Sequence, residues 1–387
     1  MSKSTQIQRV PLLPQGQGRG KGFYVGFAQQ MLDFLSQSQY IQPSESGIFT
    51  KGRILMTLRI AINGFGRIGR LVVRALLDRG HDDIAIVAIN DRGGIDSNAH
   101  LLQFDSVHGR LNTPVIKGDK TLSVGKHTIA MFAENSPETL PWGDLGVDVV
   151  MECTGKFANR VGATMHLAAG AGRVLISAPA DDADITVVYG VNHAHLTAEH
   201  RIVSNASCTT NCLAPVAAVL EACCGIRSGI MTTIHAYTND QRILDGNHRD
   251  LRRARTAGSS MIPTSTGAAK AVALVLPQLK GKLDGFAMRV PVPNVSVVDL
   301  TFLPERPITI PEIHNAMQHA AGGPMKGVLG INTLPLVSTD FNHTPESSIF
   351  DATQTRQVGE MIKVLSWYDN EWGFSHRMLD VAMAMKP

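Results

Sequence analysis

Residues 58–69 read Leu-Arg-Ile-Ala-Ile-Asn-Gly-Phe-Gly-Arg-Ile-Gly, and this stretch decides the fold. The run of β-formers over 58–63 predicts a strand, and the glycines after it have the spacing G-x-G-x-x-G. Apolar residues then recur at helical intervals over 67–79, and 84–90 is a second run of β-formers. Strand, glycine loop, helix and strand in this order predict a βαβ unit.

The glycine loop is typical of a dinucleotide-binding site. The first glycine permits the turn, the second lets a pyrophosphate approach the backbone, and the third lets the helix pack on the strand. The start of the helix offers free N–H groups to the phosphates. An acidic residue ends the second strand, where its carboxylate can accept both hydroxyls of an adenosine ribose. The predicted cofactor-binding residues of this unit are Gly64, Gly66, Arg67, Ile68, Gly69 and Asp91.

The rest of the chain predicts a parallel sheet followed by a different kind of sheet. Short buried strands are expected at 147–153, 173–177, 186–189 and 202–204, with a helix near 161–169. After Asn205 we expect a helix over 209–224, a strand over 230–235, a polar loop over about 237–262, strands at 286–292 and 295–302, and a capped helix over 369–385. The predicted fold class is α/β: a Rossmann-type dinucleotide-binding domain with an α+β domain that contains a mixed, largely antiparallel sheet.

Composition and charge exclude several classes of protein. The chain has 387 residues, 44% of them hydrophobic and 18% charged, which suffices for a sizeable core. No apolar run reaches the roughly 18 to 20 residues of a membrane span, and the first thirty residues do not resemble a signal peptide. Residues 1–55 carry a balance of +4, whereas the remainder carries −1. The basic excess therefore lies in the first segment, which argues against a nucleic-acid-binding body.

Residues 1–55 differ from the rest in composition. They contain nine glutamines and a Gly-Arg-Gly-Lys-Gly run at 18–22, which predicts a flexible N-terminal extension with a marginal helix around Phe27–Leu35. The abrupt change at Met56 suggests that Met56 is the natural start of the protein. Intact-mass analysis of protein from the native source tests this, because a mass that includes residues 1–55 contradicts it.

Five cysteines, an odd and low number, predict reduced thiols and a cytoplasmic location. They are Cys153, Cys208, Cys212, Cys223 and Cys224. Their spacings do not match those of zinc ligands, so no metal site is predicted.

Cys208 has the surroundings of a nucleophile. The segment 204–212 reads Ser-Asn-Ala-Ser-Cys-Thr-Thr-Asn-Cys and places this residue at the start of the predicted helix, where N–H groups and the helix dipole favour a thiolate. Neighbouring hydroxyls argue against a dry core position, which is the better interpretation for the other four cysteines. His235 ends a strand directly before the long loop and is the candidate proton partner, although such a histidine is by itself more often structural.

Four segments together resemble phosphorylating glyceraldehyde-3-phosphate dehydrogenase. They are Asn-Gly-Phe-Gly-Arg-Ile-Gly-Arg at 63–70, the cysteine segment at 204–212, His-Ala-Tyr-Thr-Asn-Asp-Gln-Arg at 235–242 and Trp-Tyr-Asp-Asn-Glu-Trp-Gly at 367–373. The resemblance runs from Met56 to Pro387 and leaves residues 1–55 without a counterpart. It implies four parts: an extension at 1–55, an NAD(P)-binding domain at 56–206, a catalytic domain at 207–368, and a C-terminal helix at 369–387 that returns to the NAD-binding domain.

The resemblance also implies an activity and an assembly. A cytoplasmic homotetramer would bind NAD, oxidise glyceraldehyde 3-phosphate and capture the acyl group with inorganic phosphate, giving 1,3-bisphosphoglycerate in glycolysis or gluconeogenesis. Cys208 matches the nucleophile, which forms a hemithioacetal, loses hydride to the nicotinamide and becomes a thioester. His235 matches the base, and Asn370 matches the residue that holds the nicotinamide carboxamide.

Two phosphate sites follow from the same resemblance. Thr238 and Arg289 match residues that bind the phosphate of the substrate. The residues that match the site for the incoming phosphate are Ser207, Thr209, Arg253, Thr266 and Gly267. Guanidinium groups and hydroxyls are suited to binding dianions.

Two departures from the family pattern affect the choice of cofactor. Arg92 follows Asp91 where an apolar residue is common in the strictly NAD-dependent branch, and Asp245-Gly246-Asn247 replaces a frequent Leu-Pro pair. Arg92 offsets the repulsion between the Asp91 carboxylate and a 2′-phosphate, which leads us to expect NAD as the principal cofactor with measurable use of NADP. Lys156 is a further departure for which the sequence gives no account.

Two alternatives remain open at this point. Erythrose-4-phosphate dehydrogenase uses the same nucleophile but hydrolyses the thioester, and the residues of both phosphate sites disfavour it. A non-catalytic protein that holds RNA or a partner through its basic leader is disfavoured by the complete set Cys208, His235, Arg289 and Asn370.

Overall fold

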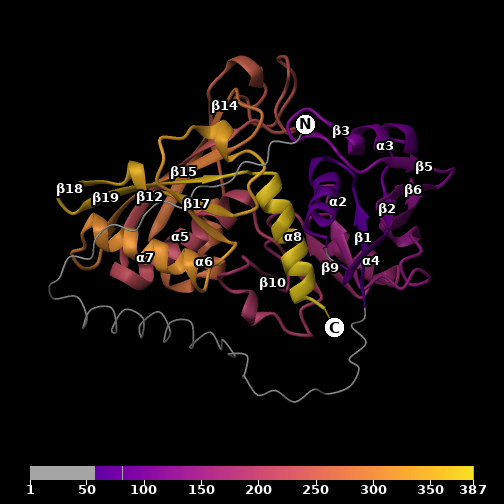
Figure 1. Cartoon of the computed structure of the whole chain (residues 1–387), viewed down its shortest axis with the longest axis horizontal. Helices are drawn as coiled ribbons and strands as arrows, with labels where there is room; N and C mark the ends of the chain where they lie inside the picture. Colours follow the sequence, from indigo (N-terminus) through magenta and orange to yellow (C-terminus); the bar gives the residue numbers. More distant parts are fainter. Residues whose placement is uncertain (1–56, 81, 387) are drawn as a thin grey trace. The chain divides into compact units, whose positions relative to one another are not determined.

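The computed structural model describes residues 57–80 and 82–386 (Figure 1). The predicted extension at 1–55 and the helix expected at Phe27–Leu35 lie outside the described residues.

Within the described residues, nine strands form one sheet in the order β10-β11-β9-β8-β1-β2-β7-β6-β5. Neighbouring strands are parallel from β10 to β7, and β6 pairs antiparallel with β5 and β7. The strands are β1 Leu58–Asn63, β2 Ile84–Asn90, β5 Val115–Lys117, β6 Thr121–Val124, β7 His127–Phe132, β8 Val149–Glu152, β9 Arg173–Ile176, β10 Ile185–Thr186 and β11 Ile202–Ser204. The predicted parallel sheet is thus confirmed, with an antiparallel edge that the pattern did not indicate.

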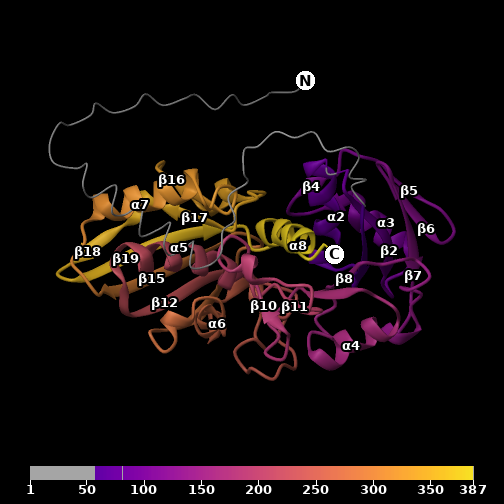
Figure 2. The ribbon, with the colours of Figure 1, turned by 90° about the horizontal axis from the view of Figure 1, so that it is seen from below.

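Three predicted strands of this sheet, at 147–153, 173–177 and 186–189, are shorter than expected. The strand expected at 186–189 is reduced to β10, because the N–H of Val188 bonds the Asn192 side chain at 2.8 Å and the chain turns away from the sheet. The helices of this part are α2 Arg67–Arg79, α3 Ile95–Gln103 and α4 Arg160–Ala168, and β3 Phe104–Asp105 pairs with β4 Gly109–Arg110. In Figure 2, α2 and α4 lie on opposite faces of the sheet. The predicted first βαβ unit is confirmed at the predicted bounds.

A second sheet follows in the described chain, in the order β13-β14-β12-β15-β19-β17-β16, with β18 paired to β19. The pairs β12 with β14 and β16 with β17 are parallel, and the others are antiparallel, so the predicted mixed, largely antiparallel sheet is confirmed. The strands are β12 Ile226–Ala236, β13 Ile262–Ser265, β14 Leu283–Val290, β15 Ser296–Pro304, β16 Leu329–Asn332, β17 Ser348–Asp351, β18 Arg356–Val358 and β19 Met361–Tyr368.

Helices cover this second sheet. Helix α5, Cys208–Cys224, packs on β12, β15, β17 and β19, and it is in turn contacted by α6, Ala268–Val275, and α7, Ile310–Gly322. Fourteen of the seventeen residues of α5 are buried, which explains its almost uniformly apolar or small side chains.

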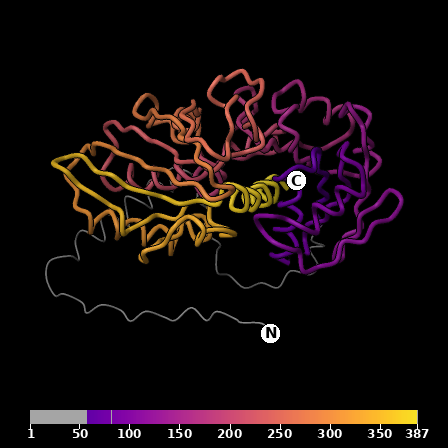
Figure 3. The backbone as a smooth tube through the Cα atoms, turned by 90° about the horizontal axis from the view of Figure 1, so that it is seen from above, coloured from indigo at the N-terminus to yellow at the C-terminus, as the bar shows by residue number. Residues whose placement is uncertain are grey.

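The last helix, α8 Trp372–Ala384, lies between the strands of the two sheets (Figures 1 and 3). It begins three residues later than the predicted 369, because the Asp369 carboxylate accepts hydrogen bonds from the N–H groups of Glu371 at 2.9 Å and Trp372 at 2.7 Å. Trp372 and Leu379 share one apolar cluster with Ile60 of β1 and Leu71 of α2. The end of the chain thereby completes the core around its first strand.

Candidate active site

The glycine loop lies at the point where the order of the strands reverses. The chain runs from β1 to β2 and β7 on one side, then returns to place β8 on the other side of β1. Ligands of open α/β sheets bind at the carboxyl ends of the strands at such a switch point. The crevice for a dinucleotide therefore lies where β1 and β8 end.

Each glycine of the loop has the surroundings that its predicted task requires. Gly64 has φ +93°, and a Cβ there would lie 2.6 Å from the backbone nitrogen of Thr154. A Cβ on Gly69 would lie 2.3 Å from the carbonyl oxygen of Gly64, whereas one on Gly66 would meet no atom within 4 Å. No side chain caps the start of α2, so its N–H groups are available to phosphate oxygens. These observations fit a bound dinucleotide.

Asp91 is held in place beside the loop. One carboxylate oxygen accepts a hydrogen bond from the N–H of Phe65 at 2.8 Å, and the other accepts from Gly93 at 2.7 Å and from the Asn98 amide at 3.3 Å. A cavity of about 470 Å³ lies next to it, lined also by Phe132 and Glu134. Neighbouring Arg92 is exposed and donates to the Asn135 side chain at 2.7 Å.

The other two predicted cofactor-binding residues, Arg67 and Ile68, lie in the first turn of α2 and have different surroundings. Ile68 is partly buried against the core. The Arg67 guanidinium pairs with Glu371 at 2.8 Å and with Asp105. Arg67 therefore connects the glycine loop to the residue that follows Asn370.

Cys208 is the first residue of α5, and the predicted helix start is correct to one residue. Ser207 is its N-cap and accepts a hydrogen bond from the N–H of Thr210 at 3.0 Å. The Sγ atom lies 3.5 Å from Nε2 of His235, which comes from the end of β12. The structure thus brings together the predicted nucleophile and its predicted proton partner.

The other ring nitrogen of His235 decides which tautomer faces the thiol. Nδ1 lies 2.7 Å from the carbonyl oxygen of Ala236 and 2.8 Å from Nη1 of Arg289. Because Nη1 also bonds that carbonyl oxygen, which can only accept, we assign the ring proton to Nδ1. Nε2 then carries the lone pair and can accept the proton of Cys208. Arg289 lies directly opposite His235 in the β12 and β14 register, and its Nη1 donates to the same carbonyl oxygen at 2.9 Å.

Burial and charge act on both members of the pair. Burial raises the pKa of the Cys208 thiol, and the Arg289 guanidinium and the Thr209 hydrogen bonds act against this rise. Burial and the same guanidinium hold the pKa of His235 well below its usual range. Both directions favour the neutral thiol and the neutral imidazole, whereas a proton transferred from Sγ to Nε2 would create two opposite charges that stabilise each other. The helix start alone does not give the thiolate that the sequence pattern suggested.

A buried tyrosine fixes the floor of this site. The Tyr368 hydroxyl lies 2.8 Å from the hydroxyl of Thr209 and 2.9 Å from that of Thr233, and its ring meets His235 edge to face. The hydroxyl of Thr209, predicted to bind phosphate, is therefore engaged within the protein in this structure.

Of the residues predicted to bind the two phosphates, Arg289 lies opposite His235, and Ser207 and Thr209 flank Cys208 in the chain. The Nε of Arg289 is buried without a hydrogen-bond partner in the described chain, which fits a cation that awaits an anion. Arg253 donates to the Thr264 hydroxyl at 2.9 Å and the Ser265 carbonyl at 3.2 Å, next to Thr266 and Gly267 at the start of α6. Its charge acts on both His235 and Arg289. Thr238 lies in the loop after β12, and its carbonyl oxygen accepts from Gln241 at 2.9 Å.

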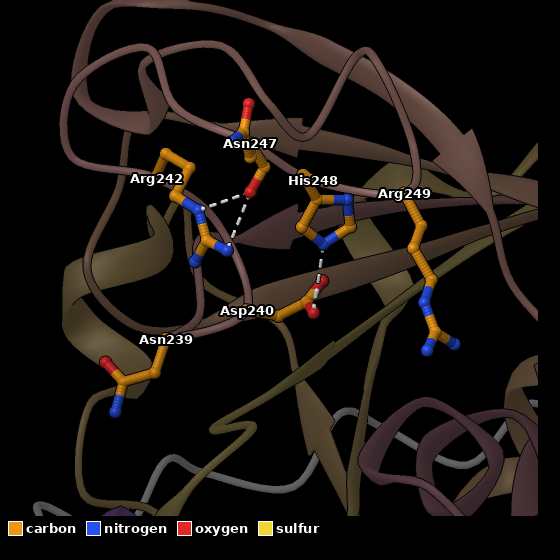
Figure 4. Close-up of a pocket in the computed structure, with 6 residues that line it drawn as sticks. All are labelled: Asn239, Asp240, Arg242, Asn247, His248 and Arg249. Carbon is orange, nitrogen blue, oxygen red and sulfur yellow. Dashed lines mark hydrogen bonds and ion pairs between the residues drawn. The ribbon is translucent and has the colours of Figure 1, made fainter.

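The polar loop at 237–262 holds Arg253 through an acidic residue. Asp240 pairs with Arg253 at 2.6 Å and with His248 at 3.2 Å. Figure 4 shows Asp240 and His248 facing each other at a pocket of about 860 Å³, where Arg242 donates to the carbonyl oxygen of Asn247. The long polar loop expected from the sequence thus contains an acidic residue that holds Arg253.

Asn370 is tied to the strand that carries the base. Its Oδ1 accepts a hydrogen bond from the Ser296 hydroxyl at 2.7 Å, and that hydroxyl accepts from the N–H of Ala236 at 3.1 Å. The amide group thereby has a fixed orientation beside His235.

Comparison with known proteins identifies the family. The glyceraldehyde 3-phosphate dehydrogenase NAD binding domain matches residues 58–160, and the C-terminal domain of the same family matches residues 207–370. Glyceraldehyde-3-phosphate dehydrogenase of Cereibacter sphaeroides is 60% identical over 331 residues, 85% of this chain and 99% of the relative. The Pseudomonas aeruginosa protein of that name is 59% identical over 332 residues (85% and 98%), and the Geobacillus stearothermophilus protein 55% over 329 residues (84% and 98%).

The chain belongs to the glyceraldehyde-3-phosphate dehydrogenase family.

The family match covers both halves of the site. The glycine loop and Asp91 lie in the segment matched by the NAD binding domain, and Cys208, His235 and Asn370 lie in the segment matched by the C-terminal domain. The resemblance and the fold class predicted from the sequence are confirmed. No helix among residues 57–80 and 82–386 is long and apolar enough to span a membrane.

Several residues that support this site of the glyceraldehyde-3-phosphate dehydrogenase fold were not predicted. Tyr368 lies within the family segment at 367–373, but its pairing with Ser296 across β15 and β19 is what brings it under the catalytic pair. Glu152 ends a buried strand, and this position is the signal that could have singled it out.

Proposed function

We propose that this chain oxidises glyceraldehyde 3-phosphate with NAD and inorganic phosphate to 1,3-bisphosphoglycerate, in glycolysis or gluconeogenesis. The observation that carries the proposal is Sγ of Cys208 at 3.5 Å from Nε2 of His235, beside the half-buried Arg289 guanidinium. A thiol with its base suits attack on an aldehyde, and the neighbouring cation suits an anionic substrate. The relatives that this chain matches over nearly their whole length are named glyceraldehyde-3-phosphate dehydrogenase.

In the proposed reaction, Cys208 Sγ forms a bond to the aldehyde carbon while His235 Nε2 accepts the thiol proton. His235 then gives this proton to the aldehyde oxygen, which becomes the hydroxyl of a hemithioacetal, and the neutral imidazole removes the same proton again as hydride leaves. Bound NAD supplies the acceptor for the two electrons of the oxidation. A phosphate oxygen then attacks the resulting thioester, and Cys208 leaves as the thiolate.

The proposal assigns the two phosphates to two groups of residues. Thr238 and Arg289 hold the phosphate of the substrate, and the buried Nε of Arg289 without a partner supports this assignment. The incoming phosphate is assigned to Ser207, Thr209, Arg253, Thr266 and Gly267. The Arg253 side chain, held by Asp240 next to the start of α6, supports the second assignment.

For the cofactor, the glycine loop, Arg67, Ile68 and Asp91 bind the dinucleotide, and Asn370 orients the nicotinamide carboxamide. The fixed Asp91 carboxylate favours the free ribose hydroxyls of NAD. We propose measurable use of NADP as well, since the exposed Arg92 guanidinium lies next to Asp91 in the chain and is held beside Asn135. If R92L leaves the NADP to NAD ratio of kcat/KM unchanged, Arg92 does not support NADP.

We propose a cytoplasmic homotetramer with domains at 56–206 and 207–368, a C-terminal helix at 369–387 and an extension at 1–55. Large apolar side chains stand exposed on the 237–262 loop, with Ile243 at 87% and Leu251 at 82%. A further cavity of about 460 Å³ on the second sheet is lined by Val297, Leu336, Trp367 and other mostly apolar residues. Such surfaces are typically covered by another subunit. Light scattering after size exclusion tests this, and a monomeric mass contradicts it.

The deciding experiment measures the steady-state rates of NAD and NADP reduction with glyceraldehyde 3-phosphate, with and without inorganic phosphate. The wild type and the C208S variant are assayed in parallel. Phosphate-dependent turnover that C208S abolishes supports acyl transfer through the thioester. Turnover indifferent to phosphate favours hydrolysis, and erythrose 4-phosphate is then the next substrate. Absence of turnover with both aldehydes contradicts the proposal.

A further inference from the structure

A buried carboxylate outside the catalytic pair lies beneath the dinucleotide crevice. Glu152 ends β8, is 1% exposed and receives hydrogen bonds on both of its oxygens. Oε1 accepts from the backbone N–H of Thr154 at 2.7 Å and from its hydroxyl. Oε2 accepts from the Asn63 amide at 2.6 Å and from Nε2 of His166 at 3.1 Å. A group that needs four donors to be buried is costly to maintain, so its position calls for an explanation.

The donors around this carboxylate have fixed directions. Trp142 Nε1 donates to Nδ1 of His166 at 3.0 Å, which leaves the imidazole proton on Nε2, pointing at Glu152. The Asn63 amide oxygen accepts from Asn90 at 2.8 Å, so the Asn63 nitrogen also has to face Glu152. A glutamine at 152 would therefore direct an NH₂ group at two donors, whichever way its amide is turned.

The contacts of Glu152 connect it to the loop after β8. The Thr154 hydroxyl that donates to Glu152 accepts in turn from the N–H of Lys156 at 2.9 Å, which closes residues 154–156 into a turn. This turn faces the glycine loop, because a Cβ on Gly64 would touch the Thr154 nitrogen. Asn63 and Glu152 are direct neighbours in the β1 and β8 pair, at the switch point of the sheet.

We propose that Glu152 is a positioning residue for the dinucleotide: its carboxylate holds the turn at 154–156 against the glycine loop and so shapes the crevice without touching the cofactor. This inference rests on the proposed function only in taking NAD as the dinucleotide. It places Lys156, a departure from the family pattern that the sequence does not explain, in a turn that its backbone N–H closes. Asn63 and His166 bond the other carboxylate oxygen of Glu152, on the side away from the turn.

The test measures binding of NAD to the full chain by isothermal titration calorimetry at 25 °C. We expect E152Q to raise the Kd for NAD about tenfold, since the loss of well-paired buried hydrogen bonds displaces the turn. T154V removes the hydroxyl that joins Glu152 to Lys156 and is expected to act in the same direction, whereas T154S keeps the affinity. In turnover, the KM for NAD rises and kcat at saturating NAD stays within about twofold.

W142F is the matched control, because it removes one donor from the same buried network on the side away from the turn. It is expected to lower the melting temperature and to leave the Kd for NAD unchanged. The double variant E152Q/T154V is expected to lose no more affinity than the worse single variant, because both act through one link.

Each outcome decides something definite. If E152Q and T154V bind NAD like the wild type, the inference is wrong although the proposed function stands. The same holds if W142F weakens binding as much as E152Q does, because general loosening of the core then explains the effect. A wild-type chain that does not bind NAD overturns the proposed function as well. Should E152Q fail to fold, the comparison of T154V with T154S decides.

Discussion

Alanine substitutions at two glycines of the loop are expected to separate stability from cofactor binding. At Gly69 an alanine Cβ would lie 2.3 Å from the carbonyl oxygen of Gly64, so α2 has to move away from the loop. Such overpacking costs about 1–3 kcal/mol of unfolding free energy. At Gly66 the new Cβ would meet no protein atom, and φ of −72° suits alanine. We therefore expect G66A to change stability by no more than about 0.5 kcal/mol.

For NAD binding we expect the opposite order, with G66A impaired more than G69A. Gly66 is exposed and directly precedes the uncapped start of α2, so a methyl group there occupies the path by which the pyrophosphate reaches the backbone. Loss of this approach is expected to raise the Kd for NAD at least tenfold, which corresponds to about 1.4 kcal/mol.

The assay pairs thermal melting of the protein without NAD with calorimetric titration of NAD. G69A is expected to melt several degrees below the wild type, and G66A to melt with it but bind NAD poorly. Wild-type affinity in G66A, or a lower melting point for G66A than for G69A, would refute the reasoning from the glycine surroundings.

Three further outcomes are expected. H235N removes the group that accepts the thiol proton, while burial still raises the pKa of Cys208. Alkylation of Cys208 by iodoacetamide at pH 7 should therefore slow by at least about tenfold, and its pH profile should shift to higher pH. An unchanged profile would show that His235 does not act on the Cys208 thiol. For Asp105, burial acts to raise the pKa, but hydrogen bonds from His108, Arg67 and Val107 outweigh it and hold the pKa at about 2. Because this pKa is depressed, the Asp105 carboxylate stabilises the folded protein by about 2 kcal/mol above the ordinary pKa near 4, and this stabilisation is lost as the pH falls toward 2. The free energies of unfolding of D105N and the wild type should therefore differ at pH 7 and converge in acid. An equal difference at all pH values would contradict this role of Asp105. S296A frees the Asn370 amide and should raise the KM for NAD several-fold with the alkylation rate of Cys208 unchanged, and an altered alkylation rate would place Ser296 in the thiol environment instead.

The parts of the fold that local sequence determines were predicted closely. The first strand, glycine loop, helix and second strand have the predicted bounds, because hydrophobic period and glycine position are both local signals. The antiparallel edge formed by β5, β6 and β7 was not predicted, since such short strands are defined by their partners more than by their own residues. The capped C-terminal helix was predicted, but the Asp369 side chain, which forms the cap, moved its start.

In the site, too, the features set by local sequence were predicted and those set by packing were not. Cys208 and His235 could be named from their positions at a helix start and a strand end. That Arg289 lies opposite His235 depends on the parallel register of β12 and β14, which join segments more than fifty residues apart. The surroundings of Cys208 depend on packing, because burial opposes the thiolate that the helix start favours. The network around Glu152 unites residues from β1, β2, β8 and α4, and no single stretch of sequence contains it.

The position of α8 has a consequence for the order in which this protein can be made. Trp372 and Leu379 complete the same apolar cluster as β1, and the pairs Arg67 with Glu371 and Arg79 with Asp380 join residues separated by 304 and 301 positions. During synthesis, the nucleotide-binding half leaves the ribosome long before these partners exist. The contacts of α2 with α8 can form only when the last helix is released. Complete packing of the first domain therefore follows the end of translation.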